Sequence, residues 1–154
     1  MSKVVLQLEA EVDFNLICIS SHHKEYRLCR DINHHTQLDF KRVEEYLLGA
    51  ADKPEMEFAQ FVFEDELEHR TFFLLTNKCL PRENVPADDD LFPTENQGKL
   101  VPELKRVDYL LQIYGHINEE QICTLVANLN ELDKVQACWK QDATVLRSKT
   151  NLLR

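Results

Sequence analysis

Residues 107–139, VDYLLQIYGHINEEQICTLVANLNELDKVQACW, decide the fold. The stretch opens with an apolar run whose side chains alternate between two faces, as along a β-strand, and Gly115 ends that run. Apolar residues then recur three and four positions apart, which is the spacing of an amphipathic helix. The short apolar run VQACW follows after Asp133 and Lys134. We therefore predict a strand, a helix and a second strand, joined by a right-handed crossover.

The helix within this stretch has a clear start. Asn118 can cap it, and Gln121 stands three residues later, which is the spacing of a capping box with Asn in the place of Ser or Thr. Burial of the apolar face stabilises the fold by about 10 kcal/mol before the entropy cost. That face consists of Ile122, Leu125, Val126, Leu129 and Leu132.

Several upstream segments are typical of strands. Residues 3–10 and 13–20 are rich in Val, Leu and Ile, and we predict a strand over each. Residues 55–63 form a clear strand, with Phe58, Gln60 and Val62 on one face, and residues 69–78 return after the charged turn EDELE. The last two segments therefore predict a β-hairpin.

One further helix is predicted near the N-terminus. Ser20 and Ser21 can cap a helix that extends to His35, with Leu28 and Ile32 on its apolar face. The pattern of the following residues, 38–52, is compatible with more than one structure.

These segments define an α+β fold class. We expect a mixed or antiparallel sheet of about five strands with two main helices on one face, ferredoxin-like or related. The length of 154 residues fits a single domain over residues 1–154. A long polar loop is expected at about residues 80–99, which contain three prolines and the run Asp88, Asp89 and Asp90.

Composition narrows the function classes. The net charge of -9 repels phosphate backbones, so we expect no nucleic acid partner. No apolar run is long enough for a signal peptide or a membrane helix, which predicts a cytoplasmic protein. The cysteine count of five is odd and no C-x-x-C occurs, so we expect reduced, non-catalytic thiols.

Residues 101–109, VPELKRVDY, carry the most specific pattern in the chain. They resemble the signature of the IPExxxVDY family, with Val101 in the place of the first Ile. YRLCRDIN at residues 26–33, TNK at residues 76–78 and LRSKTNLL at residues 146–153 are also similar to family features. The family consists of small bacterial proteins, mostly from Bacteroidetes. The resemblance implies a bacterial cytosolic origin and supplies no substrate, cofactor or catalytic residue.

This motif provides the candidate binding residues Glu103, Asp108 and Tyr109. Two carboxylates can act as an acid and a base if their environments differ. In an extended chain, however, Glu103 and Asp108 would point to opposite faces and lie roughly 16 Å apart. The structural alternative is that Glu103 bonds to backbone at the strand entry and that Asp108 pairs with a neighbouring Lys or Arg. Tyr109 is then a core ring with its hydroxyl at the edge.

Other chemistry-bearing residues give weaker signals. The pairs His22–His23 and His34–His35 would lie about 18 Å apart on one helix, and no H-x-x-x-H spacing occurs, so we expect no metal site. With three glycines in the chain, phosphate-binding and dinucleotide-binding loops are absent, and we expect no cofactor. The basic residues of the first helix and of the C-terminal segment could hold an anion or pair with surplus carboxylates. They are Arg27, Arg30, Arg147, Lys149 and Arg154.

We expect a non-catalytic interaction or ligand-binding module that forms a homodimer. Many aromatic rings fall on the predicted strands, and a dimer would hide those on a sheet face that no helix covers. The alternative is a small enzyme with a carboxylate-based site under the 80–99 loop, which would use Glu103, Asp108 and His116. A third hypothesis, by analogy of fold alone, is a sensor that binds a small molecule at a dimer edge.

Overall fold

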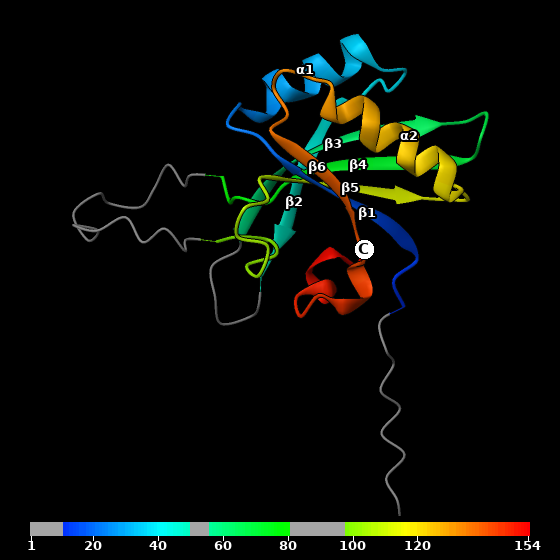
Figure 1. The fold of residues 1–154 in the computed structure, drawn as a ribbon. Helices are drawn as coiled ribbons and strands as arrows, with labels where there is room; N and C mark the ends of the chain where they lie inside the picture. The colour runs from blue at the N-terminus through cyan, green and yellow to red at the C-terminus, as the bar shows by residue number, and fades with distance from the viewer. Residues whose placement is uncertain (1–10, 50–55, 81–97) are drawn as a thin grey trace, which may run out of the picture.

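A six-stranded antiparallel sheet in the order β2-β3-β4-β5-β1-β6 forms the centre of the molecule (Figure 1). The computed structural model describes residues 11–49, 56–80 and 98–154. Each strand pairs antiparallel with its neighbours. The strands are β1 Phe14–Ser20, β2 Lys41–Leu48, β3 Met56–Asp65, β4 Arg70–Thr76, β5 Tyr109–Tyr114 and β6 Ala137–Gln141.

Two helices, α1 Glu25–His35 and α2 Glu119–Asn130, lie on the same face of the sheet (Figure 1). Helix α1 follows β1, and α2 connects β5 to β6. Strands β5 and β6 run parallel to each other with β1 between them, because both are antiparallel to β1. The order β4-β5-β1-β6 and the two helices follow the β-α-β-β-α-β pattern, with β2 and β3 inserted between α1 and β4. The predicted α+β class is confirmed.

The elements predicted from residues 107–139 are present. Asn118 accepts a hydrogen bond from the backbone of Gln121 at 2.8 Å, and the Gln121 side chain accepts one from the backbone of Asn118 at 3.2 Å. The predicted capping box is therefore confirmed. The predicted hairpin is also present as β3 and β4.

Other predictions differ from the structure. Helix α1 begins after Lys24, and neither Ser20 nor Ser21 caps it. The reason is that the Ser21 hydroxyl donates to the Lys134 carbonyl at 2.5 Å and accepts from the backbone of His23 at 3.2 Å. The ambiguous segment forms edge strand β2. The strand predicted at residues 3–10, and residues 81–97 of the predicted loop, lie outside the described residues.

Packing of the helices on the sheet forms the first of two cores. Leu28 and Ile32 of α1 and Ile122 and Leu129 of α2 are buried on this face, as their helical spacing predicts. The sheet contributes a layer of buried side chains to the same core. They are Ile17, Ile19, Ala59, Phe61, Phe72, Leu74, Leu111 and Ile113.

The second core lies on the opposite face, and the chain itself covers it. Two short 3-10 helices, η1 Ala143–Val145 and η2 Lys149–Leu152, lie below the sheet in Figure 1. Together with residues 98–108 they bury sheet side chains such as Leu16, Leu75 and Leu110. The expectation that this face holds uncovered rings for a dimer is therefore wrong for much of its area. The short 3-10 turns have no long periodicity that the sequence could show.

Candidate functional site

The 101–109 motif is wound around the side chain of Asn77, which is fully buried just after β4. The Asn77 amide nitrogen donates to the carbonyls of Leu104 and Val107 at 3.2 Å and 2.9 Å, and its oxygen accepts from the Val101 backbone at 2.8 Å. The Asn77 backbone also bonds to Leu100 and Asp108, each at 2.8 Å. Asn77 therefore fixes both ends of the motif.

Asp108 connects the motif to the turn between β1 and α1. Its carboxylate accepts from the backbone of Ser21 at 2.8 Å and from the Ser20 hydroxyl at 3.4 Å. No Lys or Arg of the described residues forms an ion pair with it, so the pairing predicted for Asp108 is wrong. The position of the turn explains the difference, because it brings the donors of Ser20 and Ser21 to the start of β5.

Tyr109 is a core residue with its hydroxyl at the edge, as the structural alternative predicts. Its ring lies in the helix-side core and its hydroxyl donates to the carbonyl of His23. Burial raises the pKa of Tyr109 well above its ordinary value of 10.0, and the nearby carboxylates of Glu25 and Asp108 raise it further. The phenol therefore stays protonated and acts as a hydrogen-bond donor at neutral pH.

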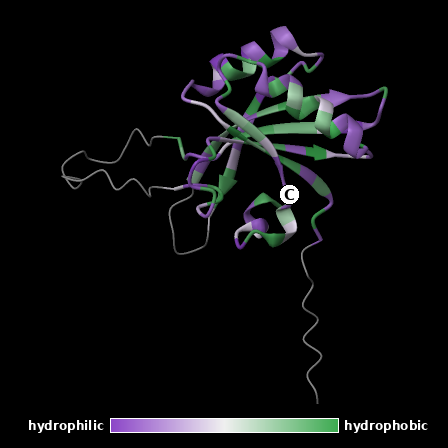
Figure 2. Ribbon diagram, viewed as in Figure 1, coloured by the Kyte–Doolittle hydropathy of each residue, from purple (hydrophilic) through white to green (hydrophobic). Residues whose placement is uncertain are grey.

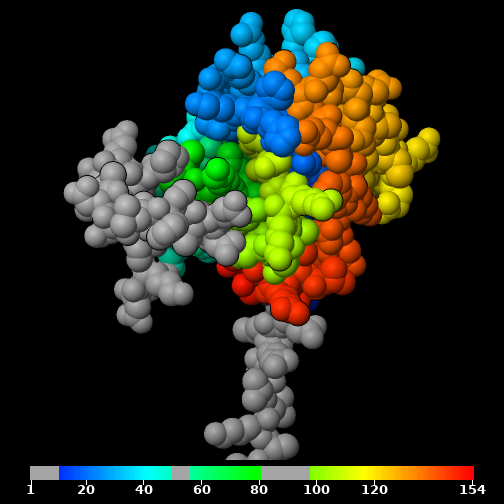
Figure 3. All heavy atoms as spheres, turned by 60° about the vertical axis from the view of Figure 1, so that its left-hand side comes forward, coloured from blue at the N-terminus to red at the C-terminus, as the bar shows by residue number. Residues whose placement is uncertain are grey.

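Glu103 connects the motif to the C-terminal segment. The exposed Glu103 carboxylate accepts from the backbone and the hydroxyl of Ser148, each at 3.2 Å. The Asn151 side chain donates to the carbonyl of Leu100 at 2.9 Å. In Figure 3 the yellow-green atoms of residues 98–108 lie directly against the red atoms of the C-terminal segment.

The two carboxylates of the motif do not converge. Glu103 contacts the C-terminal segment and Asp108 contacts the β1–α1 turn, so they share no hydrogen-bond partner among the described residues. Two hollows among the described residues have volumes of about 750 Å³ and about 460 Å³, and neither includes Glu103, Asp108, Tyr109 or His116. The motif thus joins three chain segments, namely the segment just after β4 at Asn77, the β1–α1 turn and the C-terminal segment.

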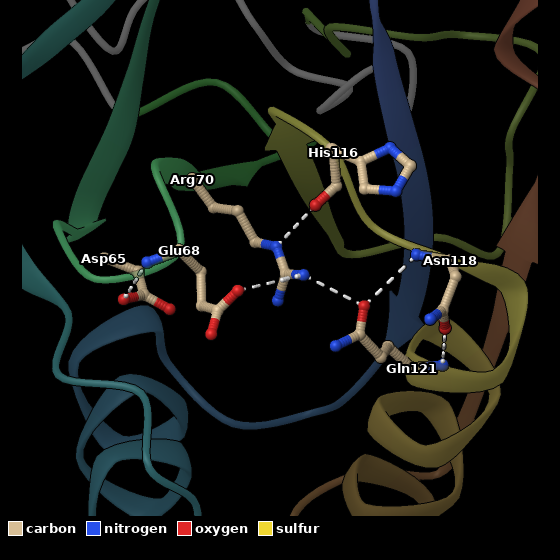
Figure 4. Close-up of polar contacts among 6 residues, drawn as sticks. All are labelled: Asp65, Glu68, Arg70, His116, Asn118 and Gln121. Carbon is tan, nitrogen blue, oxygen red and sulfur yellow. Dashed lines mark hydrogen bonds and ion pairs between the residues drawn. The ribbon is translucent and has the colours of Figure 1, made fainter.

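His116 belongs to a separate polar cluster around Arg70, at the start of α2 (Figure 4). Arg70 donates to the backbone carbonyl of His116 at 2.6 Å and to the side chain of Gln121 at 2.9 Å. The Glu68 carboxylate lies 3.9 Å from the Arg70 guanidinium. The imidazole of His116 is not used in these contacts. The cluster joins the β3–β4 turn to the capping box of α2 and does not include the motif.

Two residues organise the second core: Gln112, which the sequence analysis missed, and Arg154, which binds the Gln112 amide instead of the carboxylate or anion that was expected. Gln112 is fully buried in β5, and its amide donates to the carbonyl of Leu152 at 2.8 Å. The guanidinium of Arg154 bonds to the same amide and lies over the ring of Phe73, 3.4 Å from its centroid. A glutamine in the apolar run LLQIY was the available signal, because a buried amide needs partners.

All five cysteines are free. Burial raises the pKa of Cys29 to about 11 and the pKa values of Cys18 and Cys138 to about 12. These three thiols therefore stay protonated and are poor nucleophiles at neutral pH. Over residues 11–49, 56–80 and 98–154, no group of three or more His, Cys, Asp or Glu side chains is placed to hold a metal ion.

The fold and the motif define an α+β protein in which a polar junction joins the sheet, the β1–α1 turn and the C-terminal segment. No protein-family model, no curated protein and no solved structure matches the chain. The resemblance to the IPExxxVDY family therefore stays a prediction. Neither α1 nor α2, the helices of the described residues, is long and apolar enough to span a bilayer.

Proposed function

We propose that this chain is a non-catalytic interaction module in the cytoplasm of a bacterium. One observation supports this proposal most directly: the side chains of Glu103, Asp108 and Tyr109 all bond to other segments of the chain. Side chains that hold neighbouring segments in place have fewer free atoms for a substrate. Their absence from both hollows points in the same direction.

Metabolite profiling of the purified protein tests the proposal. The protein and a Glu103→Gln/Asp108→Asn variant are each incubated with a small-molecule extract of bacterial cells, and the extract is followed by mass spectrometry. We expect the two samples to remain indistinguishable from extract alone. Consumption of a metabolite by the unchanged protein but not by the variant would establish the enzyme alternative instead.

A homodimer stays a separate proposal, and it needs a surface other than the covered sheet face. Edge strand β2 is an unfavourable surface because four of its residues are charged and its pairing with β3 has a register shift between Val43 and Tyr46. Charges and bulges at an edge hinder the addition of another strand. Sedimentation equilibrium over a range of concentrations tests the dimer, and a monomer at high micromolar concentration rejects it.

A further inference from the structure

The solvent side of α1 carries a stripe of basic and aromatic residues. Tyr26, Arg27, Arg30 and His34 are all exposed, and the helical repeat places them on the side opposite the buried Leu28 and Ile32. The ribbon of α1 is mostly purple in Figure 2, whereas the strands below it are largely green. The outer side of α1 is therefore a polar surface with a positive centre, and we call these four residues the α1 stripe.

The arginines of the stripe have no internal acidic partner. Among the residues that the structure describes, no ion pair includes Arg27 or Arg30, and Arg27 lies 6.0 Å from the centroid of the Tyr26 ring. The nearby carboxylate of Asp31 contacts other side chains, namely those of His35 and Lys134, each at 3.4 Å. The chain has 27 acidic residues against 18 basic ones, so unpaired arginines are not explained by a shortage of carboxylates.

A groove continues from the end of the stripe. It has a volume of about 750 Å³ and lies between the end of α1 and α2, and His34 belongs to both the stripe and the groove. Leu38 and Leu125 also line the groove and pack against the helix-side core. Glu120 stands on the α2 side. An acidic ligand is therefore favoured over α1 and disfavoured beside the start of α2.

We propose that the α1 stripe binds an acidic segment of another protein. The carboxylates of that segment meet Arg27 and Arg30, and a neighbouring apolar side chain enters the groove between Leu38 and Leu125. This inference rests on the proposed function and specifies the partner by its chemistry. A short acidic segment responds mainly to charges within the screening length of about 8–10 Å, whereas a long nucleic acid is repelled by the net charge of -9.

Fluorescence anisotropy with a labelled glutamate-rich peptide that ends in leucine tests the inference. We expect saturable binding that weakens as salt is added, and no binding of a peptide in which glutamine replaces every glutamate. Arg27→Glu/Arg30→Glu should weaken binding by roughly tenfold or more, because two attractive contacts become repulsive. Circular dichroism checks the fold of the variant, and Arg27→Gln/Arg30→Gln should give an intermediate affinity.

Lys105→Glu/Arg106→Glu is the matched control, because these two exposed residues lie on the motif and the charge change is the same. This variant should bind the acidic peptide as the unchanged protein does. Equal weakening by both double variants, or no weakening by the α1 variant, would overturn the proposal. Tighter, stripe-dependent binding of a single-stranded oligonucleotide would also overturn it. Turnover of a metabolite in the profiling experiment would reject the proposed function. It would not change the result of the peptide-binding experiment, so the two failures can be told apart.

Discussion

Arg154 donates two hydrogen bonds to the side-chain oxygen of Gln112, from Nε at 3.2 Å and from Nη2 at 3.1 Å. The two residues come from the C-terminal segment and from a central strand of the sheet. The Gln112 nitrogen donates to Leu152 at 2.8 Å, so one buried amide has partners on both of its atoms. The second core is therefore held by a specific polar contact as well as by apolar packing.

Gln112→Leu should lower the free energy of unfolding by about 1–3 kcal/mol. The reason is that the carbonyl of Leu152 and the guanidinium of Arg154 lose a buried partner. Urea denaturation measures the change, and limited proteolysis should cut the C-terminal segment faster. Gln37→Leu, at an exposed position, is the control and should change stability little. Equal stability of both variants would contradict the role assigned to this contact.

Asn77→Leu should lower the free energy of unfolding by roughly 3 kcal/mol or more, because several buried backbone groups lose their partner together. Those groups belong to Val101, Leu104 and Val107. Asn77→Asp keeps the acceptor for Val101 but places a buried carboxylate against backbone carbonyl oxygens, so its stability should fall at least as far as that of Asn77→Leu. Chemical denaturation followed by tryptophan fluorescence measures all three proteins. A loss below about 1 kcal/mol for Asn77→Leu would be inconsistent with this account.

Asp108→Ala and Glu103→Ala should differ in their effect on stability. Removal of the Asp108 carboxylate leaves the backbone N–H of the buried Ser21 without its acceptor and should cost about 1–3 kcal/mol. Glu103 is exposed, and its removal should cost about 0.5 kcal/mol. Thermal unfolding at neutral pH compares the two variants directly. A larger loss for Glu103→Ala would reverse the structural roles assigned here.

Stability should fall in alkaline solution because of buried thiols. The pKa values of Cys18 and Cys138 are raised by burial from 9.0 to about 12, so the folded state keeps protons that the unfolded state releases. Their contribution is complete below pH 9 and is lost as the pH rises towards about 12. Each thiol adds up to about 1.4 kcal/mol per pH unit to the slope within that window.

Cys138→Ala removes the contribution of one thiol together with the charge effect by which Cys138 raises the pKa of Cys18. The variant should show a shallower decline of unfolding free energy between pH 9 and pH 11, measured by urea titration at each pH. Cys123→Ala, at an exposed position, is the matched control and should keep the original slope. An unchanged slope in Cys138→Ala would mean that burial of this thiol does not make the free energy of unfolding depend on pH.

The elements that sequence could predict are those with long, regular periodicity. The repeat of apolar residues after Asn118 specified α2, and a long run of apolar and aromatic residues specified β3. Strand β2 was ambiguous because its pairing shifts register between Val43 and Tyr46, which breaks the alternation, and because one edge is unpaired. Helix α1 starts later than predicted because tertiary partners occupy the side chain of Ser21.

The candidate site was predictable only in part. The motif does mark the entry to a central strand, and its carboxylates do not converge, as extended-chain geometry indicated. The partners of Glu103 and Asp108 could not be predicted, since each comes from a segment distant in the sequence. The central position of Asn77 depends on the path of a loop, and local sequence patterns do not encode such a path.

The cover of the second core has a consequence for protein synthesis. Residues 142–154 follow all six strands in the chain, so a ribosome delivers them after the complete sheet. Until they emerge, the apolar side chains of Leu16, Leu75 and Leu110 stay open to water on a nascent chain. This face of the sheet is therefore fully covered only after the C-terminal segment has been translated, and until then its open part can contact other unfolded chains.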